Sequence, residues 1–324
     1  MSRKIAFLLV AVVLAVRATA ATPLESGAAA GEKRPGPFIV DSLGRGIHLF
    51  RPAEGDSLRT NSLVVEREDG LLVVDAQPSP AAAKELLSAI SLLTPKPVRF
   101  LVLTHPHADA AGGVSAFPAN VLVIGSSACR DAMMDAAYDF GAEARSAAGT
   151  AWQEPERRPP TLVPTSDILL DDKTHPVRVI PIPAIPAHSR GDLIVSIPDA
   201  AVLAVGDLIA PLRAVWIAGG SVENWLSVLN GLIEEKPRIV APLHGPAVDS
   251  RELRLTRDAF AWLRGQVAQA FVDQIAPGIM PDRILESPAL AKYFDPAAPR
   301  DRVRATIEEV VREAQAYRKK RGLE

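Results

Sequence analysis

The sequence predicts an α/β domain in which two β-sheets pack face to face and helices cover their outer surfaces. Three observations lead to this four-layer arrangement. Short apolar runs typical of strands recur between residues 61 and 241. Tight hairpin turns join some of these runs, whereas amphipathic helical segments join others. After residue 258 the pattern changes to long amphipathic stretches, which indicate helices packed on the outside of the sheets.

The first predicted elements follow the order strand, strand, helix, strand. Residues 61–66 and 71–75 are strand-like runs, and the Asp-Gly pair between them is a hairpin signal. Residues 80–93 carry apolar side chains at helical spacing and are followed by a Thr-Pro pair that would end a helix. Residues 98–103 are almost continuously apolar, as expected for a buried strand.

The later elements complete both sheets and add the outer helices. Further short strands are expected at residues 121–124, 177–182, 193–197, 201–205 and 239–241. Residues 222–235 form the clearest helix of this region, and residues 259–275 and 301–319 are amphipathic helices. No repeat of 20 to 50 residues is visible, which disfavours a solenoid. We therefore expect a domain at 37–250 and a helical extension at 251–324 packed on it.

The N-terminal segment has the order of features found in secretory signal peptides. Arg3 and Lys4 precede an apolar run at 5–16, and small residues up to Ala20 follow. A membrane-spanning helix needs about 20 apolar residues, so a permanent anchor is the weaker interpretation. We expect residues 1–20 to be a cleaved signal peptide, 21–36 to be a flexible leader, and the protein to be periplasmic or secreted without stable membrane insertion.

The composition excludes several classes of function. Without the three basic residues of the expected signal peptide, the 36 basic residues fall to 33 against 38 acidic ones, a net charge near −5. This balance gives no electrostatic case for binding nucleic acid. Cys129 is the one cysteine, which rules out an internal disulfide and a cysteine-rich zinc site. We expect it to be a small buried residue.

Two histidines and an aspartate stand at alternate positions directly after the apolar run at 98–103: His105, His107 and Asp109. An extended chain sends every second side chain to the same side, so these three side chains can converge on one metal ion or on two adjacent ions. Two glycines, Gly112 and Gly113, then let the backbone turn tightly into the next segment.

This motif, with Thr104 before it and the two glycines after it, resembles the metal-binding motif of metallo-β-lactamase-fold hydrolases. Three later residues follow in the order that this family expects, as its third histidine, its bridging aspartate and its last histidine: His188, Asp207 and His244. Asp75 resembles the family's early aspartate, and we expect it to hold the metal loop by hydrogen bonds. The resemblance runs from about residue 61 to residue 246 and implies an αββα metallo-β-lactamase-like sandwich with C-terminal helices.

The resemblance also implies two adjacent metal positions. The first would use His105, His107 and His188, with Asp207 reaching between the positions. The second would keep Asp109, Asp207 and His244, but Ala110 stands where the family usually has a histidine. A carboxylate-rich set holds zinc less well than one with imidazole. We therefore expect one tightly bound zinc ion and a second position that is weak or empty.

The reaction implied by the resemblance is hydrolysis of a small molecule. A zinc-bound hydroxide would attack an ester, thioester, lactone or lactam-type bond, and Asp109 would orient that hydroxide or take its proton. Ala110 disfavours a β-lactamase, because it departs from the common ligand set. Two alternatives stay open at this point. One is a mono-iron dioxygenase of the persulfide dioxygenase kind, with iron on His105, His188 and Asp207, and the other is a non-catalytic metal-binding scaffold.

A few residues fall outside these motifs. We expect His48 and His175 to have surface or structural roles. Trp216 follows Asp207 closely, and it would either line a substrate pocket or pack in the core. The basic run at 317–321 is expected to be a solvated helix end.

The mature protein is predicted to begin near Ala21. The charged, apolar and small-residue order of the N-terminal segment predicts cleavage after Ala20. Intact-mass measurement of the exported protein should show the loss of residues 1–20. Recovery of the full chain from a membrane fraction would contradict the prediction.

Overall fold

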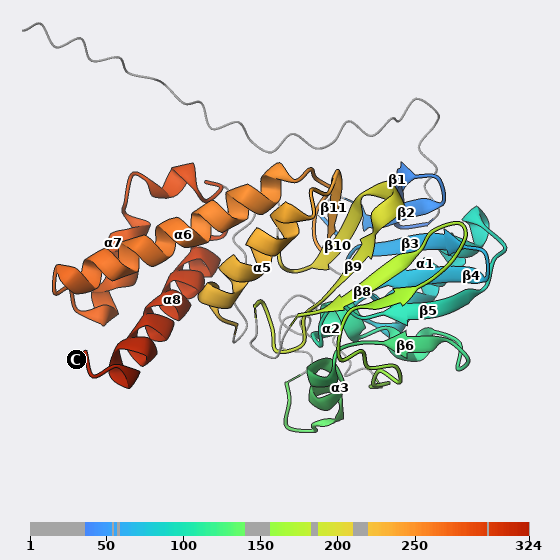
Figure 1. Ribbon diagram of the computed structural model, residues 1–324, viewed down its shortest axis with the longest axis horizontal. Helices are drawn as coiled ribbons and strands as arrows, with labels where there is room; N and C mark the ends of the chain where they lie inside the picture. Colours follow the sequence, from blue (N-terminus) through green and yellow to red (C-terminus); the bar gives the residue numbers. More distant parts are fainter. Residues whose placement is uncertain are drawn as a thin grey trace, which may run out of the picture.

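Two β-sheets form the centre of the molecule (Figure 1). The computed structural model describes residues 36–323 apart from 54, 57–58, 140–155, 183–186, 210–219 and 297. The first sheet has the strand order β1 (Phe38–Gly44), β2 (Ile47–Pro52), β3 (Ser62–Arg67), β4 (Gly70–Val74), β5 (Val98–Val102) and β6 (Leu122–Ile124). The second has the order β11 (Ile239–Pro242), β10 (Val202–Gly206), β9 (Leu193–Ile197), β8 (Val177–Pro181) and β7 (Ile168–Leu170).

Helices surround both sheets. The α-helices are α1 (Pro80–Leu93), α2 (Ala108–Ala111), α3 (Ser127–Met134), α5 (Val222–Glu234), α6 (Arg251–Val272), α7 (Met280–Leu285) and α8 (Arg300–Lys320). Short 3₁₀ turns are η1 (Val114–Ala116), η3 (Pro198–Ala200), η4 (Pro277–Ile279) and η5 (Leu290–Lys292). Among the described helices, none has the length and apolar character needed to cross a membrane.

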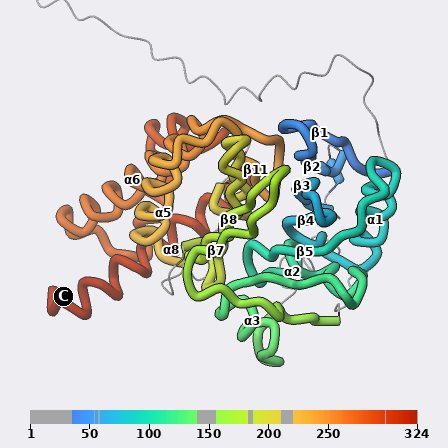
Figure 2. Tube along the Cα trace, turned by 45° about the vertical axis from the view of Figure 1, so that its right-hand side comes forward, coloured from blue at the N-terminus to red at the C-terminus, as the bar shows by residue number. Residues whose placement is uncertain are grey.

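Three apolar clusters show how the layers pack. The cluster between the sheets contains Leu72 of β4 and Val195 of β9. On the outer face of the first sheet, Val73 belongs to a cluster with Leu86 of α1. On the outer face of the second sheet, Val205 belongs to a cluster that includes side chains of α5, α6, α7 and α8. Figure 2 shows the layers one after another in space, from the C-terminal helices through the two sheets to α1. The predicted four-layer fold is confirmed.

The structure contains elements that were not predicted, among them β1, β2, β7, α3 and α7, and it lengthens one predicted helix. Strands β1 and β2 form an antiparallel hairpin at the edge of the first sheet, where no strand was predicted. Both mix buried and half-buried positions, so their apolar pattern is weak. Helix α6 begins at Arg251, eight residues before the predicted start at 259. These eight residues were not predicted as helical because they are mostly charged and expose much of their surface, so their apolar pattern is weak.

The topology brings distant loops to one edge. Strands β4 and β5 are parallel neighbours in the first sheet, and β10 and β11 are parallel neighbours in the second. Helix α1 connects the first pair and α5 the second. Because parallel strands end at the same edge of a sheet, the loops that follow each pair lie side by side. These loops carry the sequence motifs.

Candidate metal centre

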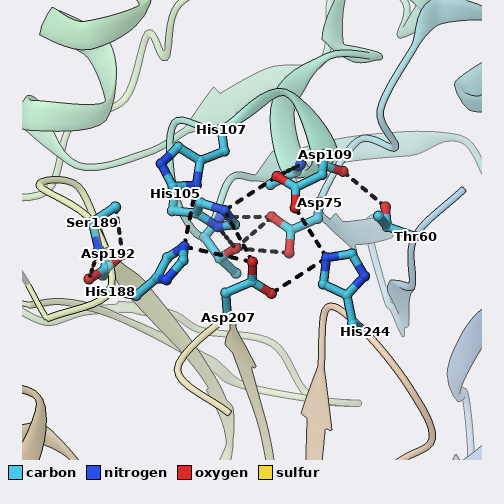
Figure 3. A network of polar contacts seen from close by, with 12 residues as sticks. Thr60, Asp75, His105, His107, Asp109, His188, Ser189, Asp192, Asp207 and His244 are labelled. Atoms are coloured by element: carbon cyan, nitrogen blue, oxygen red, sulfur yellow. Dashed lines mark hydrogen bonds and ion pairs between the residues drawn. The ribbon is translucent and has the colours of Figure 1, made fainter. Parts of the chain in front are cut away.

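The predicted site residues, apart from His188, follow these strand ends (Figure 3). Asp75 directly follows β4, and the segment from His105 to Asp109 follows β5. Asp207 directly follows β10, and His244 follows β11. The last residue, His188, lies in the loop before β9. Both sheets therefore contribute side chains to one cluster.

Three imidazoles form one side of the cluster. The ring centroids of His105, His107 and His188 lie 4.8 to 5.0 Å apart, and the rings are nearly perpendicular to one another. Nε2 of His188 is 3.3 Å from Nδ1 of His107. One ring nitrogen from each residue lies within 4.8 Å of the other two. Nitrogens that converge in this way could hold a single metal ion.

Two carboxylates approach the same imidazoles. Nε2 of His105 is 3.5 Å from Oδ1 of Asp109 and 3.9 Å from Oδ2 of Asp207. The same Oδ2 atom is 3.7 Å from Nε2 of His188. His105, Asp109 and Asp207 thus form a second group that could hold a metal ion, and His105 belongs to both groups.

His244 closes the cluster on its more open side. Its Nε2 atom lies 3.1 Å from Oδ2 of Asp109 and 3.8 Å from Oδ1 of Asp207, and its side chain is 33% exposed. Ala110 is fully buried, and its N–H donates to Oδ1 of Asp109 at 3.0 Å. The residues assigned by resemblance to a second position are therefore together, but position 110 offers no side-chain donor atom.

Two buried atoms of the cluster have no hydrogen-bond partner among the described residues: Nε2 of His105 and Oδ1 of Asp207. A buried polar atom without a partner typically costs about 1–3 kcal/mol. A metal cation would supply the missing partner to both kinds of atom, because imidazole nitrogen and carboxylate oxygen are both zinc ligands. The cluster therefore fits a bound cation in both geometry and donor chemistry.

A chain of hydrogen bonds fixes the proton position on His105. The Thr104 hydroxyl lies 2.9 Å from both carboxylate oxygens of Asp75 and 3.0 Å from Nδ1 of His105. When Asp75 is ionised, the hydroxyl donates to it and accepts from Nδ1–H. The proton then sits on Nδ1, and the lone pair of Nε2 faces the cluster. Asp75 thus has the hydrogen-bonding position expected from the sequence.

The pKa values report an excess of negative charge around this nitrogen. Burial by itself lowers the pKa of His105, but the Asp109 carboxylate, 3.5 Å from Nε2, and the charges of Asp207 and Asp75 raise it to about 10. Burial, together with the charge of His105, lowers the pKa of His107 to about 3, which keeps this ring neutral. The position of Nε2 on His105 therefore favours a positive charge.

The two carboxyl groups respond in opposite directions. Burial opposes ionisation of Asp109, yet His105 and His244 hold its pKa well below the usual range. Burial raises the pKa of Asp207 above its usual value, and the adjacent charge of Asp109 adds to this effect. Asp109 is accordingly the ionised carboxylate of the pair.

Two residues that support the cluster, Asn61 and Trp225, were not predicted from the sequence. The Asn61 side chain donates to the carbonyls of Pro242 and Gly245 at 2.9 and 2.7 Å, and so holds the loop that carries His244. Trp225 of α5 packs edge-on against His188, with 5.6 Å between ring centroids. Periodicity marks Trp225 only as a buried helical residue, and no local pattern marks Asn61.

Two residues beneath the cluster have a strained backbone. Asp75 and Gln77 have positive φ values of 65° and 73°, which side-chain-bearing residues seldom adopt. The Gln77 amide accepts from the N–H of Thr60 at 3.1 Å and donates to its carbonyl at 2.7 Å. The Thr60 hydroxyl in turn donates to the Asp109 carbonyl at 2.9 Å. These bonds connect the strained segment to the metal-binding motif.

The two glycines of the motif have a different role from the one expected. Gly112 has an ordinary helical φ of −64° and Gly113 a φ of −87°, so neither position needs the freedom of glycine to turn. A Cβ atom at Gly112 would lie 2.0 Å from the Pro78 carbonyl oxygen, and one at Gly113 would lie 2.0 Å from that of Ala76. Glycine is required because two backbone segments approach closely.

The remaining histidines lie away from the cluster. Nδ1 of His175 is 2.8 Å from the Asp199 carboxylate, and Nε2 is 2.6 Å from the Arg45 carbonyl oxygen. Both ring nitrogens thus have protein partners, as expected for a histidine with a structural role. His48 lies on β2, 3.8 Å from Glu66. Cys129 is a buried free cysteine. Trp216 lies outside the described residues.

A family model described as "Metallo-beta-lactamase superfamily" matches residues 55–244, which contain all of the cluster residues. The chain belongs to this superfamily. Its members are mostly hydrolytic enzymes. The match ends before α6, so the C-terminal helices lie beyond the part shared with the family model.

Two curated relatives are similar to this chain. A linear primary-alkylsulfatase from Pseudomonas sp. (strain ATCC 19151) is 23% identical over 269 residues, which cover 71% of this chain and 51% of that protein. A metallo-beta-lactamase type 2 from Bacillus sp. (strain 170) is 25% identical over 63% of this chain and 74% of its own length. The chain thus spans about half the length of the alkylsulfatase that it matches.

Solved structures show the same fold. A stereoselective inverting sec-alkylsulfatase from Pseudomonas sp. has a TM-score of 0.64 and 14% identity, and the match covers 83% of this chain and 49% of that one. A metallo-beta-lactamase from Pontibacter korlensis has a TM-score of 0.54 and 21% identity, covering 69% of this chain and 99% of that one.

Replacing an imidazole of the three-histidine group should remove bound metal from this protein. We expect His105→Ala or His188→Ala to abolish nearly all tight metal binding, because both residues belong to the three-imidazole group. His244→Ala should remove little, since its partners are mainly carboxylates. Metal content per chain, measured by mass spectrometry after dialysis, gives the comparison. His48→Ala, a histidine replacement away from the cluster, serves as the control, and equal loss in the three site variants would contradict the division.

Proposed function

We propose that this protein is a zinc-dependent hydrolase whose metal is held by His105, His107 and His188, with Asp207 beside them. The observation that carries the proposal is the convergence of three imidazoles and a carboxylate. Two buried atoms of these groups, Nε2 of His105 and Oδ1 of Asp207, lack a hydrogen-bond partner in the described chain. A set of three histidines leaves one coordination position for water or substrate, as catalytic zinc sites require.

The chain's own residues support hydrolysis. When bound, zinc supplies an acidified water and polarises the substrate oxygen. Thr104 and Asp75 hold His105 in the tautomer that presents Nε2. We propose that Asp109 orients the attacking water and accepts its proton, because its carboxylate is ionised and faces the cluster. His244, which is partly exposed and 3.1 Å from Asp109, lies where a substrate would enter.

The arrangement favours one tight metal ion. Both groups of possible ligands in the described chain share His105, so they form one centre and not two separate ones. The side with Asp109, Asp207 and His244 has one imidazole, and Ala110 adds no donor. Imidazole suits zinc better than carboxylate does. We therefore propose a weak or empty second position.

The substrate class is proposed to be a small-molecule ester. Acyl esters, thioesters and lactones follow from the expected chemistry, and the names of two relatives add alkyl sulfate esters. The likeness to the sec-alkylsulfatase covers 83% of this chain, whereas that to the lactamase from Pontibacter korlensis covers 69%. Ala110, which departs from the common ligand set of the lactamases, favours an ester over a lactam.

An activity panel tests the function. The protein, purified without added metal, should gain turnover of at least one ester class when zinc is supplied and lose it to a chelator. The His105→Ala variant should lose about 10-fold to 100-fold or more of this activity under the same conditions. No turnover of acyl esters, thioesters, lactones, lactams or alkyl sulfates by the zinc-loaded protein would support a non-catalytic scaffold. Iron as the dominant metal would support the dioxygenase.

Ala110→His should raise the metal content from near one to near two ions per chain. Ala110 is buried but lies outside the apolar clusters that contain Ala108 and Ala111, and it directly follows Asp109. An imidazole there would join Asp109, Asp207 and His244, with an expected gain on the order of 10-fold in affinity for the second ion. Zinc titration against a competing chelator measures it.

Ala111→His is the matched control. Ala111 belongs to the apolar cluster on the outer face of the first sheet, so its replacement should add no metal. A second ion bound equally well by the parent would contradict the one-metal proposal. No gain in the Ala110→His variant would contradict the assignment of position 110 to the second position.

A further inference from the structure

Helix α8 reaches the N-terminus of α5 although it lies beyond the part of the chain that matches the family model. Figures 1 and 2 show the two helices next to each other on the outer side of the second sheet. The contact is made by Glu313. The Ser221 hydroxyl donates to its Oε1 atom at 2.6 Å, and the N–H of Val222 donates to its Oε2 atom at 2.9 Å.

The first turn of α5 holds the loop that carries His188. The N–H of Ser221 donates to the Ala187 carbonyl at 3.2 Å. Gly220 packs so closely on this loop that a Cβ atom there would lie 1.8 Å from the Ala187 oxygen. Trp225, at the end of this first turn, is fully buried against the His188 ring. The position of His188 therefore depends on the position of this turn.

The same turn also holds the segment that carries Asp207. The indole N–H of Trp225 donates to the carbonyl of Leu208 at 2.9 Å. Leu208 directly follows Asp207, and both Leu208 and Trp225 belong to the apolar cluster beneath the helices. One helical turn thus contacts the backbone next to two of the proposed metal ligands.

We infer that Glu313 is a positioning residue for the metal centre, acting through the first turn of α5. The inference rests on the metal site of the proposed function. Capping alone does not require Glu313, because the Ser221 side chain already accepts from the N–H of Asn224 at 3.4 Å. Docking of α8 does not depend on it either, since Val303, Ile307 and Val310 are buried in the core. What Glu313 adds is a two-oxygen link that fixes the turn, and the carboxylate is favourable at a helix N-terminus.

The test compares zinc affinities, measured with a competing chelator, for the full chain and its variants. Glu313→Ala should lower the affinity by about 10-fold or more, as expected when residues that orient metal ligands are lost. Glu313→Gln should restore most of it, because the amide oxygen can accept from Val222 while the amide nitrogen donates to the Ser221 oxygen. The cobalt-loaded Glu313→Ala protein should show an altered visible absorption spectrum, because His188 is displaced.

Glu308→Ala is the matched control. Glu308 is an exposed acidic residue of the same helix that pairs only with Arg304 on the surface of the described chain, so its loss should leave zinc affinity unchanged. Thermal unfolding of each metal-free variant reports whether the fold is retained. If Glu313→Ala does not fold, Ser221→Ala replaces it, because it breaks the 2.6 Å bond from the other side and should also weaken zinc binding.

The outcomes separate the inference from the function on which it rests. Unchanged zinc affinity in a folded Glu313→Ala or Ser221→Ala variant overturns the positioning role and leaves the hydrolase proposal standing. A parent protein that binds no zinc overturns both. Loss of affinity in Glu313→Ala with recovery in Glu313→Gln supports the role of Glu313.

Discussion

The buried nitrogen Nε2 of His105 lacks a hydrogen-bond partner in the described part of the chain, and the whole centre is arranged around it. Carboxylates of Asp109 and Asp207 lie within 4 Å of it, and Thr104 fixes the opposite face of the ring. Desolvated negative charge and an unpartnered nitrogen are costly unless a cation joins them. The site is therefore suited to a bound cation.

The fold satisfies this requirement by placing two pairs of parallel strand ends together. The segment after β4 supplies Asp75, the segment after β5 supplies the histidine motif, and the segments after β10 and β11 supply Asp207 and His244 (Figure 3). Because the β-strands end in fully buried segments, the loops begin from fixed positions. Rigid strands below and α5 beside them leave few degrees of freedom to the side chains of the site.

The centre is chemically asymmetric. Three imidazoles occupy one side, whereas two carboxylates and the partly exposed His244 occupy the other. A neutral nitrogen-rich set suits a tightly held zinc ion, and the carboxylate-rich side suits interaction with water, protons and an incoming substrate. Under the proposed function, Ala110 in place of a histidine shifts the second half of the centre from metal binding toward acid–base chemistry.

Local sequence was sufficient to determine much of the fold and the histidine motif, whereas His188, Asp207 and His244 were assigned by the resemblance to a family. Helix α1 has the predicted bounds, and His105, His107 and Asp109 could be recognised because alternate residues of an extended segment share one face. The weakly patterned strands β1 and β2 were not predicted. The four-layer order followed from strands joined by both hairpins and helices.

Only the tertiary structure decided which distant residues support the site. Asn61 bonds to the Gly245 carbonyl across 184 positions, and Ser221 bonds to Glu313 across 92. Neither pair leaves a periodic trace in the sequence, because each contact is set by how sheets and helices pack after they form. Likewise, the close backbone approach at Gly113 depends on a neighbour, the Ala76 carbonyl, that only the folded chain brings near.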